Sequence, residues 1–327
     1  MKGIVYCTYF NKGYLSRGIV LLRSLSRFSR DYVVEVLCFD EETYAFLSRY
    51  DFGSVVPVPI SEFESRHPEL TAVKPTRSRG EYFFTCTSSW TQDVLARHTE
   101  SSMVIYLDAD MKFFASPDPM LESMSDKDII ICDHNFERDY ELQAEHGRFN
   151  VGFVAFRNNE VGVDCLSRWA SDCIDWCYDR AEDGKYADQK YLDAWPERYG
   201  DRLYVAPKGV DLGPWGIGKD ELTVKDGLPY ISDEPVILYH YQGLRLFGKR
   251  HYYLGYYYHH PVSKILEVLY EPYIRELSAV EEEFSLSGNG GNARYARGNL
   301  LYRLFTGYWL GWPMLADAQL LIQRLFR

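Results

Sequence analysis

The first third of the chain alternates short apolar runs with segments whose apolar residues recur at helical spacing. One such segment, residues 14–28, places Ile19, Leu22, Leu25 and Phe28 about three positions apart, close to the period of an amphipathic helix. Strands separated by helices pair in parallel, because the chain must cross back over the sheet before the next strand begins. The pattern predicts an α/β fold, with an open, largely parallel sheet, helices on both faces and a functional site at the carboxyl edge. The expected strands are 3–9, 33–39, 54–58 and 103–107, and the expected helices are 14–28, 41–49 and 89–98.

The later part of the chain predicts the rest of this domain, a linker and a tail. Residues 285–292 are rich in Ser, Gly and Asn, a composition typical of linkers. Residues 293–327 carry five arginines and one acid, and two apolar stripes at helical spacing predict an amphipathic helical tail. The expected organisation is therefore a main domain at 1–284, a linker at 285–292 and a basic tail at 293–327. The further expected strands are 129–132, 149–156, 203–206 and 236–239, and the further helices are 161–178, 187–195 and 265–277.

Composition excludes several classes of protein. The 327 residues are 46% hydrophobic and 25% charged, which is typical of globular domains and not of disordered or fibrous chains. The formal charge of −11 disfavours general nucleic-acid binding. Seven cysteines without a C-x-x-C pair favour a reducing, cytoplasmic location, and neither a signal peptide nor a run of about 20 apolar residues is expected. The basic tail leaves two alternatives open: packing on the domain or a second subunit as a homodimer, or peripheral contact with the anionic inner face of a membrane.

The most informative segment is the apolar run 103–107, which ends directly in Asp108-Ala109-Asp110. Strand periodicity sends Asp108 and Asp110 the same way at the sheet edge, where two carboxylates can clamp a divalent cation that carries a diphosphate. One alternative is an acidic loop after a core strand. Another is a phosphatase of the haloacid dehalogenase type, but that enzyme carries its D-x-D after the first strand, and here the motif follows the fourth.

Four motifs together resemble one known family. They are Tyr106-Leu-Asp-Ala-Asp110, Phe149-Asn-Val-Gly152, Ala187-Asp-Gln189 and His240-Tyr-Gln-Gly243. Their order and spacing are similar to those of the retaining nucleotide-sugar glycosyltransferases of the GT-A fold, the family 8-like group, over about residues 3–277. The resemblance implies Mn²⁺ or Mg²⁺ bound by Asp108, Asp110 and His240. It also implies that an opening loop with Thr8, Tyr9 and Tyr14 contacts the base and ribose of the nucleotide.

Each of the later motifs also has a plain structural interpretation. His240 alone could be a structural histidine, although beside two carboxylates a neutral imidazole completes a metal site. Asn150 could reach the donor sugar or the acceptor, with Gly152 permitting close backbone approach, or the pair could be a strand entry. Asp188 and Gln189 could cap a helix, or they could face the donor sugar as the resemblance implies and steady positive charge at its anomeric carbon.

The chain departs from the family after the histidine. Members of the family usually show H-x-x-G-x-x-K-P-W, whose lysine holds the diphosphate, and here the K-P-W is missing. We expect Asp108, Ala109 and Gly243 to lie at the nucleotide, with Arg245, Lys249 or Arg250 supplying the charge. A basic cluster, Lys74, Arg77 and Arg79, could touch phosphate or an anionic acceptor, or simply form an exposed loop. The aromatic run 252–260 could be a platform for a sugar acceptor or a packing surface for the tail.

The sequence therefore predicts a metal-dependent hexosyltransferase that uses a nucleoside diphosphate sugar, with UDP as the expected nucleotide. Its acceptor would be a hydroxyl on a glycan or lipid-linked glycan, in cell-surface polysaccharide or lipopolysaccharide synthesis. Retention of configuration is implied by the resemblance alone. Two alternatives stay open: an inverting GT-A transferase with a carboxylate general base, and an inactive subunit that binds sugar nucleotides or glycans.

Overall fold

The computed structural model of the chain describes residues 3–29, 31–136, 145–217, 220–246, 252–254 and 262–286. Several sequence predictions lie outside these residues. They are the basic tail at 293–327, most of the linker at 285–292, Lys249, Arg250 and most of the aromatic run 252–260. The division of the chain into domain, linker and tail stays a prediction.

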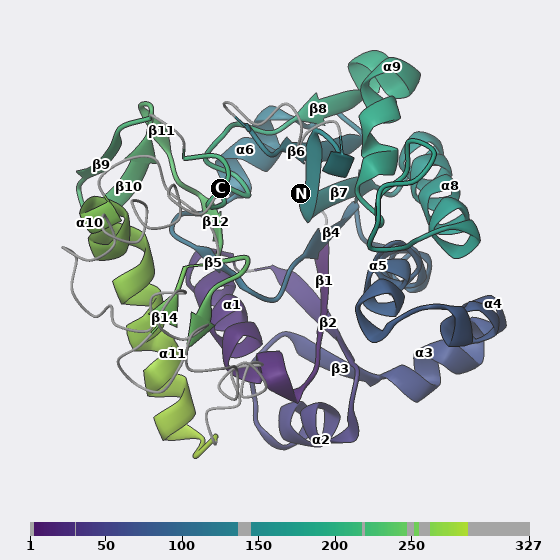
Figure 1. Cartoon of the computed structure of the whole chain (residues 1–327), viewed down its shortest axis with the longest axis horizontal. Coiled ribbons are helices and arrows are strands. Elements are labelled where there is room, and N and C mark those ends of the chain that lie inside the picture. Colours follow the sequence, from purple (N-terminus) through teal and green to yellow (C-terminus); the bar gives the residue numbers. More distant parts are fainter. Residues whose placement is uncertain are drawn as a thin grey trace, which may run out of the picture.

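Seven strands form the central sheet in the order β3-β2-β1-β4-β7-β6-β8, confirming the predicted α/β fold (Figure 1). The parallel pairs are β1 with β2 and β4, β2 with β3, and β6 with β8, whereas β7 runs antiparallel to both β4 and β6. The ends of β1, β4 and β6 therefore meet at one edge, which is the carboxyl edge. The strands are β1 Ile4–Phe10, β2 Tyr32–Cys38, β3 Val55–Pro59, β4 Met103–Leu107, β6 Ile129–Asp133, β7 Phe149–Arg157 and β8 Leu203–Val205.

Helices cover both faces of this sheet, and alternate residues of its strands enter two separate cores. Along β4, Ile105 and Leu107 enter one core and Val104 and Tyr106 the other. In Figure 1 α1 and α11 lie on one side of the sheet, and α3, α4, α5 and α8 lie on the other. The longer helices are α1 Leu15–Phe28, α2 Glu41–Arg49, α5 Arg79–Arg97, α8 Glu160–Asp175 and α11 Glu271–Glu283, and the shorter ones are α3 Ile60–Arg66, α4 Pro68–Val73, α6 Asp118–Ser123, α9 Trp195–Tyr199 and α10 Val262–Ile265.

Three helix predictions need correction. The predicted helix at 89–98 is longer, because α5 begins at Arg79, where the Ser78 hydroxyl and the Glu81 carboxylate form a capping box. The predicted helix at 161–178 is shorter, because Trp176 adopts an extended conformation after Asp175. The predicted helix at 187–195 is a turn followed by a 3₁₀ segment, Lys190–Ala194, because Ala187 has a left-handed φ of 44° that no α-helix accepts.

Small antiparallel sheets complete the described structure. Strand β12, Leu238–His240, pairs with β5, Met111–Phe113, and is shorter than the predicted strand at 236–239. The other short strands are β9 Leu222–Lys225, β10 Leu228–Ile231, β11 Glu234–Pro235, β13 Arg245–Leu246 and β14 Tyr252–Tyr253. Between α10 and α11 one π-helical turn, Leu266–Tyr270, takes part of the predicted helix at 265–277.

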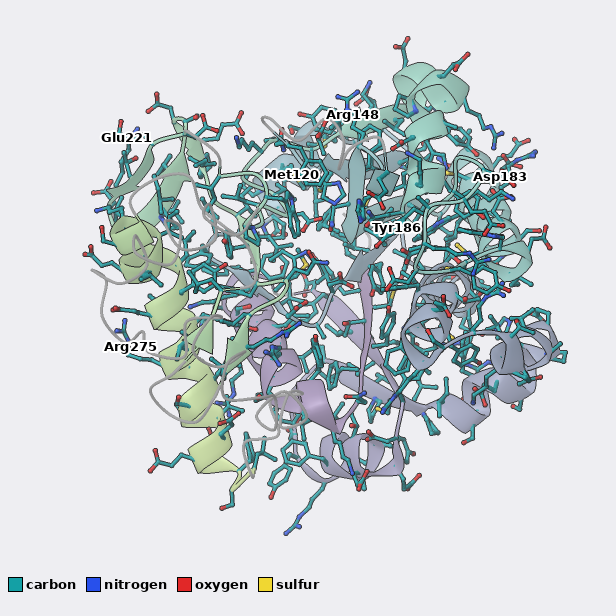
Figure 2. All side chains as sticks on the ribbon, viewed as in Figure 1. Met120, Arg148, Asp183, Tyr186, Glu221 and Arg275 are labelled. Atoms are coloured by element: carbon teal, nitrogen blue, oxygen red, sulfur yellow. The ribbon has the colours of Figure 1, made fainter. Side chains whose placement is uncertain are left out.

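The side chains divide sharply between interior and solvent. Figure 2 labels Met120 of α6, which is buried, and Arg275 of α11, whose side chain is largely exposed. The cysteines among the described residues are free and buried, as expected for a chain without a disulfide framework. No helix in the described part of the chain is long and apolar enough to cross a lipid bilayer.

Candidate metal and nucleotide site

Two acids follow strand β4 at the carboxyl edge of the central sheet. Asp108 and Asp110, with the buried Ala109 between them, form the loop from β4 to β5. The backbone N–H of Asp108 donates to the Gly152 carbonyl of β7 at 3.0 Å, and the Tyr106 hydroxyl donates to Asp108 Oδ1 at 2.6 Å. Asp110 is buried, whereas the Asp108 side chain keeps about a third of its surface exposed. The loop is therefore fixed on two sides and open on one.

Pairing of β12 with β5 brings His240 to these acids. His240 lies opposite Met111 in the pairing, and the N–H of Tyr241 donates to the Asp110 carbonyl at 2.9 Å. His240 Nε2 is 3.3 Å from Asp110 Oδ1 and 3.5 Å from Asp108 Oδ2. One ligand atom from each of the three residues lies within 4.8 Å of the other two. Residues far apart in the sequence thus meet as the D-x-D motif and the late histidine predict.

A third acid, Asp211, completes this cluster and was missed by the sequence analysis. Its Oδ1 is 3.0 Å from His240 Nδ1, and both side chains are buried. The N–H of His240 donates to the Leu212 carbonyl at 2.9 Å, which holds this loop beside β12. Gly152 makes room for the pair, since a Cβ there would lie 2.6 Å from both Asp211 Oδ1 and His240 Nδ1. Asp211 has a left-handed φ of 56° in an irregular loop, so periodicity gave no signal for it.

The cluster of Asp108, Asp110, Asp211 and His240, named here the site cluster, carries excess negative charge. Burial raises the pKa of Asp108 to about 6, with help from Asp110 and Asp211 and against the opposing effect of His240. Burial also raises the pKa of Asp211, and its bond to His240 opposes this. For Asp110 the effect of burial is outweighed by His240 and by Arg17, so its pKa is lowered. Three acids against one histidine leave the site cluster short of positive charge.

This donor set fits a divalent cation. Two carboxylates and one imidazole nitrogen are ligands that Mn²⁺ and Mg²⁺ accept, and they leave positions for diphosphate oxygens. Burial lowers the pKa of His240, but Asp110 and Asp211 outweigh it and raise the pKa well above its ordinary value, so without an ion the ring is protonated. A divalent cation would replace the Nε2 proton, and the neutral ring would keep its Nδ1–H on Asp211 while its Nε2 lone pair faces Asp108 and Asp110, as metal-binding histidines commonly do. The residues present thus agree with the metal that the sequence predicts, and the choice of ion stays open.

Asn150 lies beside the site cluster with its amide engaged in the protein. Its Oδ1 accepts the N–H of Gly152 at 2.6 Å, and its Nδ2 is 3.0 Å from His134 Nε2. The other ring nitrogen of His134 is 3.2 Å from the Arg148 carbonyl, which can only accept, so Nδ1 carries the proton. Burial lowers the pKa of His134 to about 4, consistent with a neutral ring. These contacts orient Asn150, and its predicted contact with a sugar stays a prediction.

Asp188 is buried and feels the charge of Asp108. Burial raises the pKa of Asp188 to about 7, the Thr87 hydroxyl opposes this, and the charge of Asp108 adds to it. The Asp188 carbonyl accepts the indole N–H of Trp169 at 2.8 Å, which fixes the turn that carries the carboxyl group. A buried carboxyl group with few partners is typical of a functional position.

Gln189 follows in the same turn and is partly buried. Its amide nitrogen donates to the His146 carbonyl at 2.7 Å, from a segment between β6 and β7. Asp188 and Gln189 therefore precede a 3₁₀ segment, and the predicted position at the start of an α-helix is wrong.

Thr8 and Tyr9 lie near the carboxyl end of β1, which ends at Phe10. The Thr8 carbonyl accepts the indole N–H of Trp90 at 3.1 Å, and among the described residues the buried Thr8 hydroxyl has no hydrogen-bond partner. The Tyr9 hydroxyl is 3.1 Å from the Thr87 hydroxyl. Burial raises the pKa of Tyr9 well above its ordinary value, and the charges of Asp108 and Asp188 add to this effect.

Tyr14, in the 3₁₀ turn before α1, feels the charges of Asp110 and of Arg245, the first residue of β13. The charge of Asp110, ahead of burial, raises the pKa of Tyr14 to about 12, and Arg245 is among the charges that oppose it. Tyr14 is 40% exposed, which leaves its ring accessible to a ligand. Gly243 has a left-handed φ of 75° in the exposed turn after β12, and Lys249 lies outside the described residues.

The basic cluster of 74–79 is engaged with the protein. Lys74 pairs with Glu64 at 2.6 Å, and Arg77 donates to the Ile174 carbonyl at 3.1 Å while it stacks on the Tyr178 ring at 3.9 Å. The pair with Glu64 ties Lys74 to α3, and Arg77 ties the segment before α5 to the end of α8 and the loop after it. These contacts favour the structural interpretation of this cluster.

Comparison with known proteins gives a consistent result. Residues 33–193 match the family model described as nucleotide-diphospho-sugar transferase. The uncharacterized protein YfnF of Bacillus subtilis (strain 168) is 33% identical over 249 residues, 74% of this chain and 82% of YfnF. YfnD of the same strain is 27% identical over 280 residues, 85% of this chain and 89% of YfnD. An active-site mutant of LgtC superposes with a TM-score of 0.52 at 13% identity, over 88% of this chain and 99% of LgtC, a likeness that shows the fold.

Proposed function

The chain belongs to the nucleotide-diphospho-sugar transferase family and is a glycosyltransferase, and we propose that it moves a hexose from a UDP-sugar to a hydroxyl of a glycan. The observation that carries this proposal is the site cluster, where Asp108, Asp110 and His240 converge at the carboxyl edge of the sheet. Open α/β sheets bind their ligands at this edge. The chain brings the three residues together from the ends of β4 and β12.

We propose that Asp108, Asp110 and His240 hold Mn²⁺ or Mg²⁺. When bound, such an ion neutralises the negative charge that accumulates on a departing diphosphate. Asp211 holds the Nδ1–H of His240 and so keeps Nε2 directed at the two acids. Tyr14 feels the charges of both Asp110 and Arg245, and we propose that Tyr14 and Arg245 contact the nucleotide and its phosphates.

Asp188 is the proposed group for the sugar. Its ionised carboxylate would hold hydroxyls of the donor and stabilise positive charge at the anomeric carbon. Gln189 and Asn150 are proposed to complete the contacts to donor and acceptor. We propose retention of configuration, on the family resemblance. The acceptor hydroxyl would attack on the face that UDP leaves and give its proton to the departing phosphate, which needs no protein nucleophile.

The acceptor and the location are proposed more broadly. We propose a glycan or lipid-linked glycan acceptor in cell-surface polysaccharide or lipopolysaccharide synthesis, and a cytoplasmic enzyme. The basic composition of 293–327 supports peripheral contact with an anionic membrane. Flotation with liposomes, with and without anionic lipid, tests this for the full chain against a chain ending near Ser287. Lipid binding that truncation leaves unchanged would contradict the membrane proposal.

A panel of nucleotide sugars tests the function without knowledge of the acceptor. Each donor is incubated with the full chain, with Mn²⁺ or with chelator, and hydrolysis is followed together with thermal stabilisation. We expect metal-dependent hydrolysis of one or a few UDP-sugars, with the released hexose keeping its anomeric configuration by NMR. Stabilisation without any hydrolysis or transfer would favour an inactive binding subunit, and inverted product would favour the inverting alternative.

A further inference from the structure

Arg17 of α1 is a buried cation without an ion pair among the described residues. Its side chain is 3% exposed, and its Nη2 donates a hydrogen bond to the Leu244 carbonyl at 2.7 Å. Lys112, the other buried Lys or Arg of the described chain, is paired with Glu276 at 2.9 Å. Burying an uncompensated charge is costly, so a nearby excess of negative charge must offset the cost at Arg17.

The contacts of Arg17 connect the two loops that border the site cluster. Its guanidinium lies 4.8 Å from the centre of the Tyr14 ring, at the end of the opening loop. Its hydrogen bond to Leu244 reaches the turn that follows His240, which is closed by a bond from the Leu244 N–H to the Tyr241 carbonyl at 3.0 Å. Arg17 thus fixes the turn directly after the proposed metal ligand.

From its position between Tyr14 and Leu244, Arg17 also acts on Asp110 through its charge. The charge of Arg17 is one of the influences that lower the pKa of Asp110, after the opposing effect of burial and after His240. Arg17 also lowers the pKa of Tyr14, against Asp110 and burial, which raise it. Burial raises the pKa of Glu281, and Arg17 opposes this rise, so Asp110 of the site cluster and Glu281 together supply the counter-charge of Arg17.

A divalent cation would change this balance. With a neutral His240, the ionised Asp108, Asp110 and Asp211 carry three negative charges, and a divalent ion leaves one. Arg17 then balances that last charge, so a diphosphate that binds the ion meets a site without net negative charge, whereas without Arg17 it would meet one excess negative charge. A guanidinium is suited to this role because it stays protonated when buried.

We propose that Arg17 is a fixed second cation of the diphosphate site, acting through its charge and through the turn 241–244. It would supply part of the positive charge that the resemblance expects from a lysine after His240, since the K-P-W of the family is missing. Arg17 is a positioning residue in this account, and the inference rests on the proposed function.

Binding measurements on three variants of the full chain test this proposal. Arg17→Met removes charge and hydrogen bond, Arg17→Gln removes the charge but can still donate to the Leu244 carbonyl, and Arg17→Lys keeps the charge. Titration calorimetry gives the Kd of UDP with saturating Mn²⁺ and the Kd of Mn²⁺ alone. Arg23→Met is the matched control, because Arg23 lies on the same helix and pairs with the exposed Glu283 at 2.7 Å.

We expect Arg17→Met and Arg17→Gln to weaken UDP binding about tenfold or more, the size of a coulombic interaction between unit charges roughly 10 Å apart inside a protein. The same variants should bind Mn²⁺ alone at least as tightly as the parent, because a cation next to Asp110 has been removed. Arg17→Lys should stay within about threefold of the parent for UDP, and Arg23→Met should match the parent. A merely structural role would not change UDP and Mn²⁺ affinity in opposite directions.

Two results would overturn the proposal. One is parental UDP affinity in Arg17→Gln. The other is a parallel loss of UDP and Mn²⁺ binding with a lowered melting temperature, which would make Arg17 structural. If Arg17→Met does not fold, the Kd of UDP is compared between Arg17→Gln and Arg17→Lys instead. If the parent protein does not bind UDP in the presence of Mn²⁺, the proposed function is overturned as well. If the parent binds UDP and Arg17→Gln binds it equally tightly, only the inference about Arg17 is overturned.

Discussion

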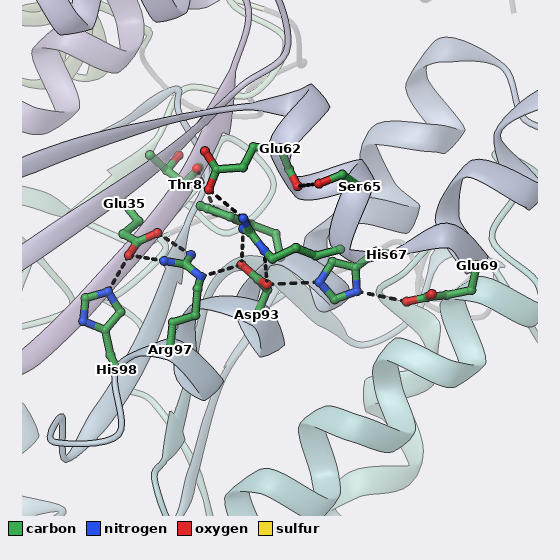
Figure 3. A network of polar contacts seen from close by, with 11 residues as sticks. Thr8, Glu35, Glu62, Ser65, His67, Glu69, Asp93, Arg97 and His98 are labelled. Carbon is green, nitrogen blue, oxygen red and sulfur yellow. Dashed lines mark hydrogen bonds and ion pairs between the residues drawn. The ribbon is translucent and has the colours of Figure 1, made fainter.

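Two groups of buried charges in this molecule differ in how completely they are paired. The first, named here the paired cluster, surrounds two buried acids with four basic side chains (Figure 3). Its members are the acids Glu35 and Asp93 and the basic residues Arg66, His67, Arg97 and His98. The second is the site cluster, in which three acids share one histidine. Both bury carboxylates, but only the paired cluster supplies a cation for each of them.

The contacts of the paired cluster are short and many. Asp93 accepts from Arg66 at 2.8 and 3.0 Å, from Arg97 at 2.8 Å and from His67 at 3.1 Å, and Glu35 is bound by Arg97 and His98 (Figure 3). Burial alone would raise the pKa of Asp93, yet these partners hold it well below its usual range. At Asp108 burial prevails instead, and the pKa rises to about 6. Complete pairing therefore stabilises the fold, whereas incomplete pairing leaves a site that favours a cation.

Removing a ligand carboxylate should have the largest effect. Asp110→Asn takes away a charge that the diphosphate-bound cation needs, so we expect transfer to fall by about a thousandfold or more. Steady-state rates with the active UDP-sugar measure this. Asp93→Asn, the same change in the paired cluster, should keep its rate per folded molecule. Equal losses in the two variants would erase the distinction between the clusters.

Asp188→Asn should have the next largest effect, on turnover. The proposed contact is to the sugar and its developing charge, so we expect kcat to fall about a hundredfold while the Kd of UDP stays within about threefold. Since burial raises the pKa of Asp188 to about 7, its carboxylate is lost as pH falls through 7, and the parent should show an acid limb there. Parental activity in Asp188→Asn would return Asp188 to a structural role.

The free energy of unfolding should change in opposite directions in the two clusters. Asp93→Asn leaves Arg66 and Arg97 without their shared partner, and because both arginines are partly exposed we expect a loss of about 2–3 kcal/mol. Folding raises the pKa of the Asp108 carboxyl group, so its charge destabilises the folded state. Asp108→Asn removes this charge and keeps an oxygen that accepts from Tyr106. With chelator present, we therefore expect the free energy of unfolding to rise by about 1 kcal/mol. Urea unfolding at pH 7 measures both. If Asp108→Asn unfolds more easily than the parent, the site cluster does not carry a destabilising excess of negative charge.

The smallest effect concerns pH. The hydrogen bond to Asp93 raises the pKa of His67, against burial, and a bond to Glu69 adds to it. The stability that this pair contributes is fully present below the ordinary histidine pKa near 6.5, and it is lost as pH rises through the raised value. We expect the difference in unfolding free energy between parent and His67→Gln to shrink by about 1 kcal/mol from pH 6 to pH 9. In the Asp93→Asn background this pH dependence should disappear, and its persistence there would place the partner of His67 elsewhere.

The pattern of apolar residues predicted the regular part of the fold, because strands that are buried on both faces of a sheet are apolar at successive positions. Residues 103–107 are apolar at every position, and the D-x-D that follows marked the edge correctly. His240 was found through its motif. Asp211 was not, since its position depends on a left-handed loop residue beside β12 and on the space at Gly152. Arg17 was missed for a related reason. The spacing of residues along α1 does not show that the turn 241–244, far away in the sequence, packs on Arg17 and buries it.

The central claim is that the site cluster binds a divalent cation that in turn binds the diphosphate. Titration calorimetry of the full chain with UDP, once with Mn²⁺ and once with chelator, tests it most directly, with Asp93→Asn as a control that should match the parent. We predict UDP binding that strengthens at least about tenfold with Mn²⁺ and loses that gain in Asp110→Asn. Identical UDP affinity with Mn²⁺ and with chelator would contradict the account.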